Sequence, residues 1–128
     1  MRAVVMDGFG GVEVMRVDDV PKPTPKENEV LIKVAATSIN RPDLVQREGK
    51  YPAPPGDSEI LGLEVSGIIE SIGSAVSEWK PGDRVLALVG GGGYAEYAVA
   101  YANHVMPMPS SMSFEEAACV CESYITAF

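Results

Sequence analysis

The sequence predicts a mainly β fold, an all-β barrel or sandwich with short helices. Three observations carry this prediction. Short apolar segments rich in Val and Ile recur at roughly 8–12-residue spacing. Glycine and proline turns separate these segments. The chain has 128 residues, 46% of them hydrophobic, which is enough for one domain with its own core but not for two.

The N-terminal third is expected to contain three strands. Residues 2–7 are short and apolar, and the valines within 12–17 mark a second strand beyond a glycine-rich turn, so the two predict a hairpin. Residues 20–28 contain three prolines and no periodicity, which predicts an extended surface linker. Residues 29–39 form an apolar run long enough for a strand that is buried on most of both faces.

The stretch 39–67 is where we expect the chemistry. Asn40 stands at a strand end, and Pro42 suits the first turn of a short helix because its missing N–H would be unbonded there. Gly49 suits the left-handed position that closes such a helix. Tyr51 follows in a proline-rich loop. Asn40 and Tyr51 therefore flank one short helix and can face the same cleft.

Short strands are expected in the later part of the chain as well. Residues 65–72 predict one strand, and residues 84–89 and 94–100 predict two more. The four glycines at 90–93 are interpreted as a flexible hairpin turn that joins this last pair. They do not open a helix, so they are not a phosphate-binding loop of the G-x-G-x-x-G type. Residues 105–109 predict a final extended piece.

A helix is expected at the C-terminal end. Ser113 fits the N-cap and Glu116 the third helical position of a capping box. The helix should run to Phe128 with little core of its own to pack on, and the apolar helical pattern continues to the last residue. The expected organisation is a domain over 1–112 and, over 113–128, the start of a helix that leads to a domain absent from the chain.

Composition and charge exclude several classes of function. Ten basic and eighteen acidic side chains give a formal net charge of −8, which disfavours nucleic acid and anionic membranes as partners. No apolar run approaches the ~20 residues of a membrane-spanning helix, and the N-terminus does not fit a signal peptide, so we expect a cytoplasmic protein. Cys119 and Cys121 are interpreted as small buried hydrophobes, since their spacing suits neither a mutual disulfide nor a zinc site.

A set of short motifs spans the whole chain and resembles one known family. The motifs are Asn40-Arg41-Pro42-Asp43-Leu44, Gln46-Arg47-Glu48-Gly49, Tyr51 with Pro54-Pro55-Gly56, Gly62 to Gly67, Trp79 to Val85, Gly91 to Tyr97 and Thr126-Ala127-Phe128. They resemble the N-terminal, GroES-like catalytic domain of the medium-chain dehydrogenase/reductase superfamily. Within it they are most similar to the NADPH-dependent quinone oxidoreductases of the zeta-crystallin type, especially the tumour-suppressor-inducible branch.

The resemblance implies a fold, a reaction and a second domain. The fold would be a GroES-like, partly open β-barrel, and the reaction a hydride transfer from NADPH to a quinone or conjugated enone. NADPH would be bound mainly by a Rossmann domain beyond this chain, so the 128 residues alone are expected to be inactive. The full-length form would be a homodimer. A non-catalytic fragment that acts as a binding or interaction module remains the alternative.

The resemblance also assigns roles to site residues. Tyr51 would donate to the substrate oxygen, and Asn40 would lie on the nicotinamide side of the cleft as both a catalytic and a cofactor-binding residue. Thr126 would contact the nicotinamide ring. Each has a structural alternative: Tyr51 could pack on nearby prolines, Asn40 could cap the short helix, and Thr126 could bond to its own helical turn. Cys121 stands where the family usually has a proline, which affects where Thr126 points.

No metal is expected. The zinc-dependent relatives use a cysteine and a histidine at positions that hold Asn40 and Leu63 here, and neither side chain can replace those ligands. The cysteine loop that binds a structural zinc in relatives is replaced by residues 88–91. His104 is interpreted as a surface or turn residue. Glu64, which follows Leu63, could serve as a general acid, but we favour a structural carboxylate bonded to nearby backbone or to a basic side chain.

Overall fold

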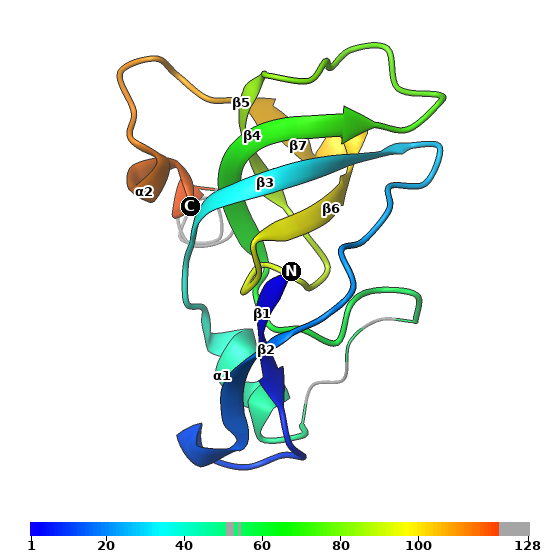
Figure 1. Cartoon of the computed structure of the whole chain (residues 1–128). Helices are drawn as coiled ribbons and strands as arrows, with labels where there is room; N and C mark the ends of the chain where they lie inside the picture. Colours follow the sequence, from blue (N-terminus) through cyan, green and yellow to red (C-terminus); the bar gives the residue numbers. More distant parts are fainter. Residues whose placement is uncertain (51–52, 54, 121–128) are drawn as a thin grey trace.

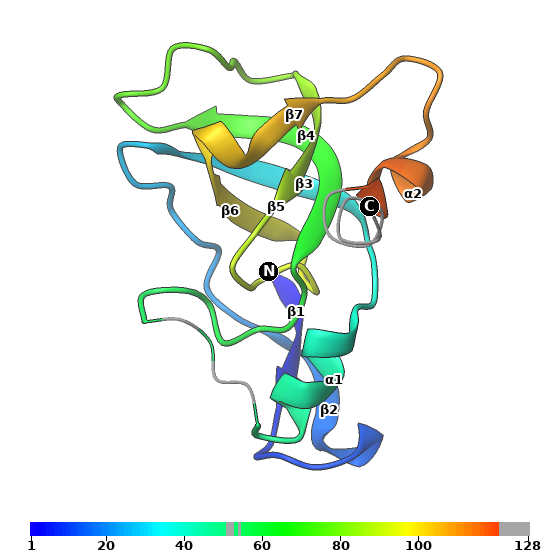
Figure 2. The same cartoon turned by 180° about the vertical axis from the view of Figure 1, so that it is seen from behind.

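The computed structural model describes residues 1–50, 53 and 55–120 and arranges their strands in two antiparallel sheets (Figures 1 and 2). A small hairpin pairs two strands, β1 (Arg2–Met6) and β2 (Met15–Asp19). The larger sheet has the order β6-β3-β4-β5-β7. Its strands are β3 (Glu29–Thr37), β4 (Glu64–Ile72), β5 (Arg84–Leu88), β6 (Tyr97–Tyr101) and β7 (Val105–Pro107). The mainly β prediction is confirmed.

The larger sheet curls into a partly closed barrel (Figure 1). The register between its central strands, β3 and β4, shifts between Leu31 and Ile32 and again between Val34 and Ala36. Such shifts bend a strand and increase its twist. The concave side of the sheet holds the main core, whose fully buried members are Val30, Ile32, Val65, Ile69, Val85 and Ala87. The half-exposed Trp79 closes one side, where its indole Nε1 donates to Ala102 O at 3.0 Å.

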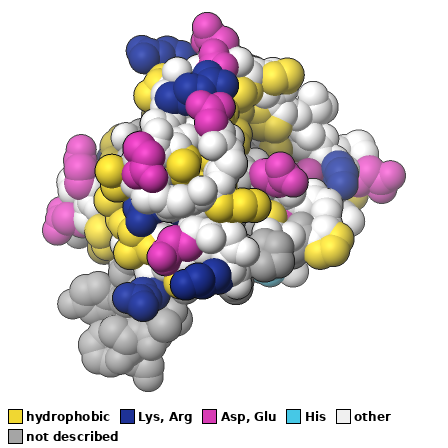
Figure 3. Space-filling view, turned by 90° about the horizontal axis from the view of Figure 1, so that it is seen from below, with side chains coloured by type: hydrophobic (Ala, Val, Ile, Leu, Met, Phe, Trp, Pro, Cys, Tyr) yellow, Lys and Arg dark blue, Asp and Glu magenta, His cyan; other side chains and the backbone are white. Residues whose placement is uncertain are grey.

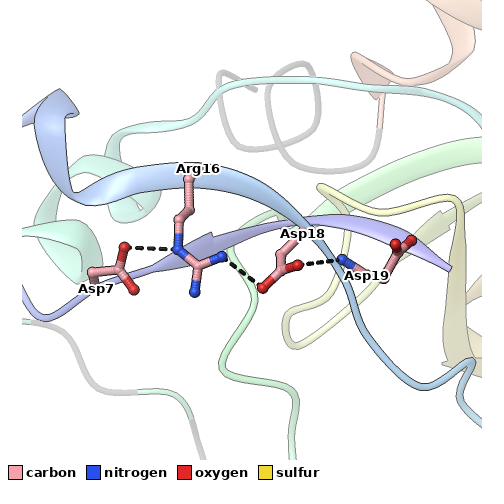
Figure 4. Close-up of polar contacts among 4 residues, drawn as sticks. All are labelled: Asp7, Arg16, Asp18 and Asp19. Atoms are coloured by element: carbon pink, nitrogen blue, oxygen red, sulfur yellow. Dashed lines mark hydrogen bonds and ion pairs between the residues drawn. The ribbon is translucent and has the colours of Figure 1, made fainter.

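The N-terminal hairpin is attached to the larger sheet through the segment before β6. Val4 N donates to Tyr94 O at 2.9 Å, and Glu96 N donates to Arg2 O at 3.1 Å. On the hairpin itself Arg16 bonds to Asp7 (2.7 Å) and Asp18 (2.6 Å), as Figure 4 shows. The hydrogen bond to Asp7 and then that to Asp18 raise the pKa of Arg16 above its usual value. Because all three side chains are exposed, these pairs contribute little to stability.

The proline-rich segment 20–26 has neither helix nor strand, as expected for a linker. It is held against the larger sheet by Lys22, whose ammonium group bonds to Glu70 on β4 and lies 4.1 Å from the centre of the Tyr97 ring. Viewed from below, acidic, basic and hydrophobic side chains are interspersed over the surface (Figure 3). None of the helices that the structure describes is long and apolar enough to cross a membrane.

The interpretation of residues 90–93 as a hairpin turn is wrong. β5 pairs with β4 and β7, whereas β6 pairs with β3 at the opposite edge of the sheet. Residues 89–94 instead run beside residues 60–63. Gly92 N donates to Ile60 O at 2.7 Å, and Tyr94 N donates to Leu61 O at 2.9 Å. The glycines therefore serve a close approach of two backbones, not a flexible turn.

The two helices begin where the capping signals predict. α1 (Arg41–Arg47) has Asn40 as its N-cap residue and is followed by Gly49 in the left-handed region, with φ +86°. α2 (Phe114–Ala117) has Ser113 as its N-cap residue, and Ser113 Oγ accepts from Glu116 N at 3.1 Å. Both arms of this capping box are present, since Glu116 also accepts from Ser113 N.

The expectation that the C-terminal helix has little core of its own is wrong for its described part. Ala117 is buried in a second apolar cluster with Leu86 and Met108. Ser66 on β4 also donates its hydroxyl to Phe114 O. The prediction of a buried Cys119 is wrong too, because the Cys119 side chain is exposed. Cys121 and the rest of 121–128 lie outside the described residues.

We expect Gly62→Ala to lower the free energy of unfolding by about 2–4 kcal/mol. Gly62 has φ +110°, and an added Cβ would lie 2.6 Å from Gly93 Cα. Gly82→Ala is the matched control, because Gly82 has φ +96° and no atom within 4 Å of an added Cβ. The control should lose only about 1 kcal/mol from backbone strain. Urea unfolding of both variants measures the difference, and equal losses would show that the close approach at Gly62 carries no cost.

Candidate functional site

A cluster of three polar side chains forms where β3 leads into α1 and β4 begins. Asn40 Nδ2 donates to Glu64 Oε1 at 3.2 Å and to Ser38 Oγ at 3.3 Å. The Ser38 hydroxyl in turn donates to Glu64 Oε1. Glu64 is 1% exposed, so its carboxylate is a buried acceptor. The expectation of a structural, hydrogen-bonded Glu64 fits this geometry, although these partners are an amide and a hydroxyl and not the backbone or a basic side chain.

The β3–β4 pairing brings these residues together. Thr37, the last residue of β3, lies opposite Val65, and Thr37 Oγ1 donates to Glu64 O at 2.7 Å. Glu64 therefore begins its strand directly beside the segment that carries Ser38 and Asn40. Neighbouring residues of β4 are buried on both faces at this end, which excludes water from the carboxylate.

A second buried carboxylate, that of Asp43, holds the backbone of Asn40. Asp43 is 2% exposed, and its Oδ2 accepts from Asn40 N at 3.0 Å and from the Tyr94 hydroxyl at 2.6 Å. Burial, followed by the bond to Asp43, raises the pKa of Tyr94 above its usual value. Tyr94 therefore stays a hydrogen-bond donor at neutral pH. The other oxygen, Asp43 Oδ1, is buried and has no hydrogen-bond partner among the residues that the structure describes.

An open groove of about 620 Å³ adjoins this polar cluster. It lies between the hairpin and the end of β3, and its lining includes Val4, Val17, Val34, Ile39 and Tyr94. Ile39 is 76% exposed although it is a large apolar residue next to Asn40. The groove therefore offers a largely apolar lining next to the segment that leads from β3 into α1, as in sites for small organic ligands.

Of the three residues predicted for the site, the structure places Asn40. It occupies the N-cap position of α1, and its side chain reaches the buried Glu64. Its contact with a nicotinamide stays a prediction. Tyr51 and Thr126 lie outside the described residues.

Three residues in or next to the cluster were not predicted from the sequence as site residues: Ser38, Asp43 and Tyr94. Asp43 had a signal, because it stands at the third helical position after an Asn N-cap, as in a capping box. Ser38 and Tyr94 had none, since their places depend on the pairing of β3 with β4 and on the path of residues 89–94. Among the described residues no group of three or more His, Cys, Asp or Glu side chains could hold a metal ion.

The sequence profile described as "Alcohol dehydrogenase GroES-like domain" matches residues 26–110. The chain belongs to this family. The match confirms the GroES-like fold. Together with the relatives and solved structures described next, it confirms the resemblance to the zeta-crystallin-like part of the medium-chain dehydrogenase/reductase superfamily.

Relatives of this GroES-like domain include two kinds of protein. The chain is 42% identical over 130 residues to a quinone oxidoreductase of Lama guanicoe, covering 100% of this chain and 39% of that protein. It is 38% identical over 128 residues to the synaptic vesicle membrane protein VAT-1 homolog-like of Mus musculus, covering 100% of this chain and 31% of that protein. The chain thus spans less than half the length of these relatives.

Solved structures agree with these matches. The human VAT-1 homolog-like protein superposes with a TM-score of 0.92 at 38% identity, covering 99% of this chain and 41% of that one. The Escherichia coli quinone oxidoreductase complexed with NADPH gives a TM-score of 0.84 at 32% identity, covering 94% of this chain and 37% of that one. The shared region is therefore a GroES-like domain that in both cases forms part of a longer protein.

We expect Tyr94→Phe to lower the free energy of unfolding by about 1–3 kcal/mol, because it removes a donor from a buried carboxylate. Tyr101→Phe is the matched control, since Tyr101 is 51% exposed and its change should stay within about 0.5 kcal/mol. Thermal or urea unfolding measures both variants. Equal stability of the two variants would show that the hydrogen bond between Tyr94 and Asp43 makes no net contribution to the free energy of unfolding.

Proposed function

We propose that the chain is the GroES-like catalytic domain of an NADPH-dependent quinone oxidoreductase that works without zinc on a quinone or conjugated enone. The observation that carries the proposal is the Asn40 amide held against the buried Glu64, in a chain 42% identical over its whole length to a quinone oxidoreductase. The solved relative that contains NADPH supports the choice of cofactor. The proposed location is the cytoplasm.

The donor set of the cluster fits a nicotinamide. Asn40 Nδ2 is bonded to Glu64 and Ser38. In the proposed complex the amide oxygen, an acceptor with two lone pairs, accepts from the carboxamide NH₂ of the cofactor. Bound NADPH would supply the hydride. By family resemblance, Tyr51 would donate to the substrate oxygen that gains charge and Thr126 would contact the nicotinamide ring. The chain's part is to bind, orient and exclude water.

The proposal includes a longer protein. The relatives extend well beyond the matched region, and in this family a Rossmann domain holds the phosphates of the cofactor. In the proposed organisation residues 1–112 form the catalytic domain and residues 113–128 begin the connecting helix. The 128 residues alone would then be inactive. A homodimer is the proposed full-length form, and the formal charge of −8 argues against nucleic acid and membrane partners.

We expect the full-length protein to oxidise NADPH in the presence of a quinone after dialysis against a strong zinc chelator. Asn40 and Leu63 stand at the positions where zinc-dependent relatives have their ligands, and neither an amide nor an isobutyl side chain replaces those ligands. Absorbance at the nicotinamide band follows the reaction, and metal analysis verifies the removal. Activity lost on dialysis and restored by zinc would contradict the proposal. No turnover with quinones or enones would favour the non-catalytic interaction module.

We expect Tyr51→Phe in the full-length protein to slow quinone reduction by about 10- to 100-fold, because a donor to a charge-developing oxygen is lost. NADPH affinity should change little, since Tyr51 is assigned to the substrate. Single-turnover measurement of NADPH oxidation separates the two effects. An unchanged rate would show that Tyr51 only packs in its loop, and Tyr101→Phe, on the exposed end of β6, serves as the matched control.

A further inference from the structure

The buried Glu64 carboxylate is bonded to the side chain through which the proposed site contacts its cofactor. A carboxylate that is 1% exposed is costly unless its oxygens are hydrogen-bonded. Oε1 accepts from both Ser38 Oγ and Asn40 Nδ2. One hydrogen bond of the Glu64 carboxylate therefore orients the Asn40 amide. A carboxylate whose role was only to stabilise β4 would not require this bond.

The chemistry of an amide makes this contact directional. The two ends of the Asn40 side chain have nearly the same shape, but the nitrogen donates and the oxygen accepts. An amide oxygen turned towards Glu64 Oε1 would face another acceptor, so the carboxylate selects the orientation with Nδ2 inward. The backbone end of Asn40 is held by Asp43 Oδ2, itself bonded to Tyr94. One residue is therefore fixed at both ends by buried acids.

We propose that Glu64 is a positioning residue that orients the Asn40 amide so that its oxygen meets the nicotinamide carboxamide. The inference rests on the proposed function, in which Asn40 contacts the cofactor. In Glu64→Gln the new side chain offers an NH₂, to which the Asn40 amide can turn its oxygen, so that the competent orientation falls to about one molecule in ten. The apparent affinity for the nicotinamide end falls with the fraction of molecules in the competent orientation.

The test is a double-mutant cycle in the full-length protein with Glu64→Gln, Asn40→Ala and both changes together. We expect Glu64→Gln to lower kcat/KM for NADPH by about tenfold, and by less than about twofold when Asn40 is already Ala. Binding of 2′-phospho-ADP-ribose, which lacks the nicotinamide, should be unchanged in all three. The inference would be overturned if Glu64→Gln lowered kcat/KM by the same factor with Asn40 and with Ala at that position. An equal loss of affinity for 2′-phospho-ADP-ribose would also overturn it.

Ser66→Ala is the matched control for loss of a buried hydrogen bond from the same strand. Ser66 is fully buried on β4 and donates to Phe114 O, but it does not bond to Asn40. This variant should be less stable yet stay within about twofold of the unmodified protein in kcat/KM. If Glu64→Gln does not fold, Ser38→Ala removes one partner of the same amide and should show the same dependence on Asn40.

A second measurement is independent of turnover. In ¹⁵N spectra of the 128-residue chain the Asn40 side-chain amide, assigned by its loss in Asn40→Ala, should exchange slowly with solvent. Glu64→Gln should speed this exchange by about tenfold or more, and Ser66→Ala should not. Equal exchange in all variants would overturn the inference. A protected amide in a full-length protein that neither binds NADPH nor reduces quinones would contradict the proposed function, while the positioning contact stands.

Discussion

The pairing of β3 with β4 is the constraint on which the rest of the structure depends. These strands occupy the middle of the larger sheet, and every other strand of that sheet adds to one of them or to β5. Their register places Thr37 opposite Val65, so the first residue of β4 lies beside the segment that leaves β3. A slip by one residue would exchange the faces of β4 and remove Glu64 from Asn40. The core and the polar cluster are thus set by the same pairing.

This arrangement places two carboxylates where a stable core would have apolar side chains. Glu64 and Asp43 are both almost fully buried, and within the described part of the chain one oxygen of Asp43 has no hydrogen-bond partner. Burying such groups lowers stability unless each is well bonded, and an unbonded oxygen costs free energy. Local conflicts of this kind are expected at functional sites, since they hold a side chain in one orientation at the expense of stability. Asn40 is the residue that both acids hold, by its side chain and by its backbone.

The sequence predicted those parts of the fold that are decided locally. The first hairpin, the short helix closed by Gly49 and the capping box at Ser113 were all confirmed, because each depends on residues a few positions apart. The predicted pairing of β5 with β6 was wrong, because the partner of a strand depends on residues far apart in the sequence. In addition, a run of glycines such as 90–93 is equally compatible with a turn and with a close approach of two backbones. The exposure of Cys119 likewise depends on which side of α2 meets β5.

The candidate site was predictable to a smaller extent, for a physical reason. Asn40 stood out because it lies between a predicted strand and a predicted helix, and Asp43 follows from the same capping pattern. Glu64 and Tyr94 reach the cluster from segments far along the chain, and their contacts exist only once β4 and residues 89–94 are in place. The absence of a side chain at Gly62 lets residues 89–94 pack directly against the segment that precedes β4, since an added Cβ would clash with Gly93. The orientation of one amide therefore depends on tertiary structure as a whole, which ties the geometry of the site to the cooperative folding of the barrel.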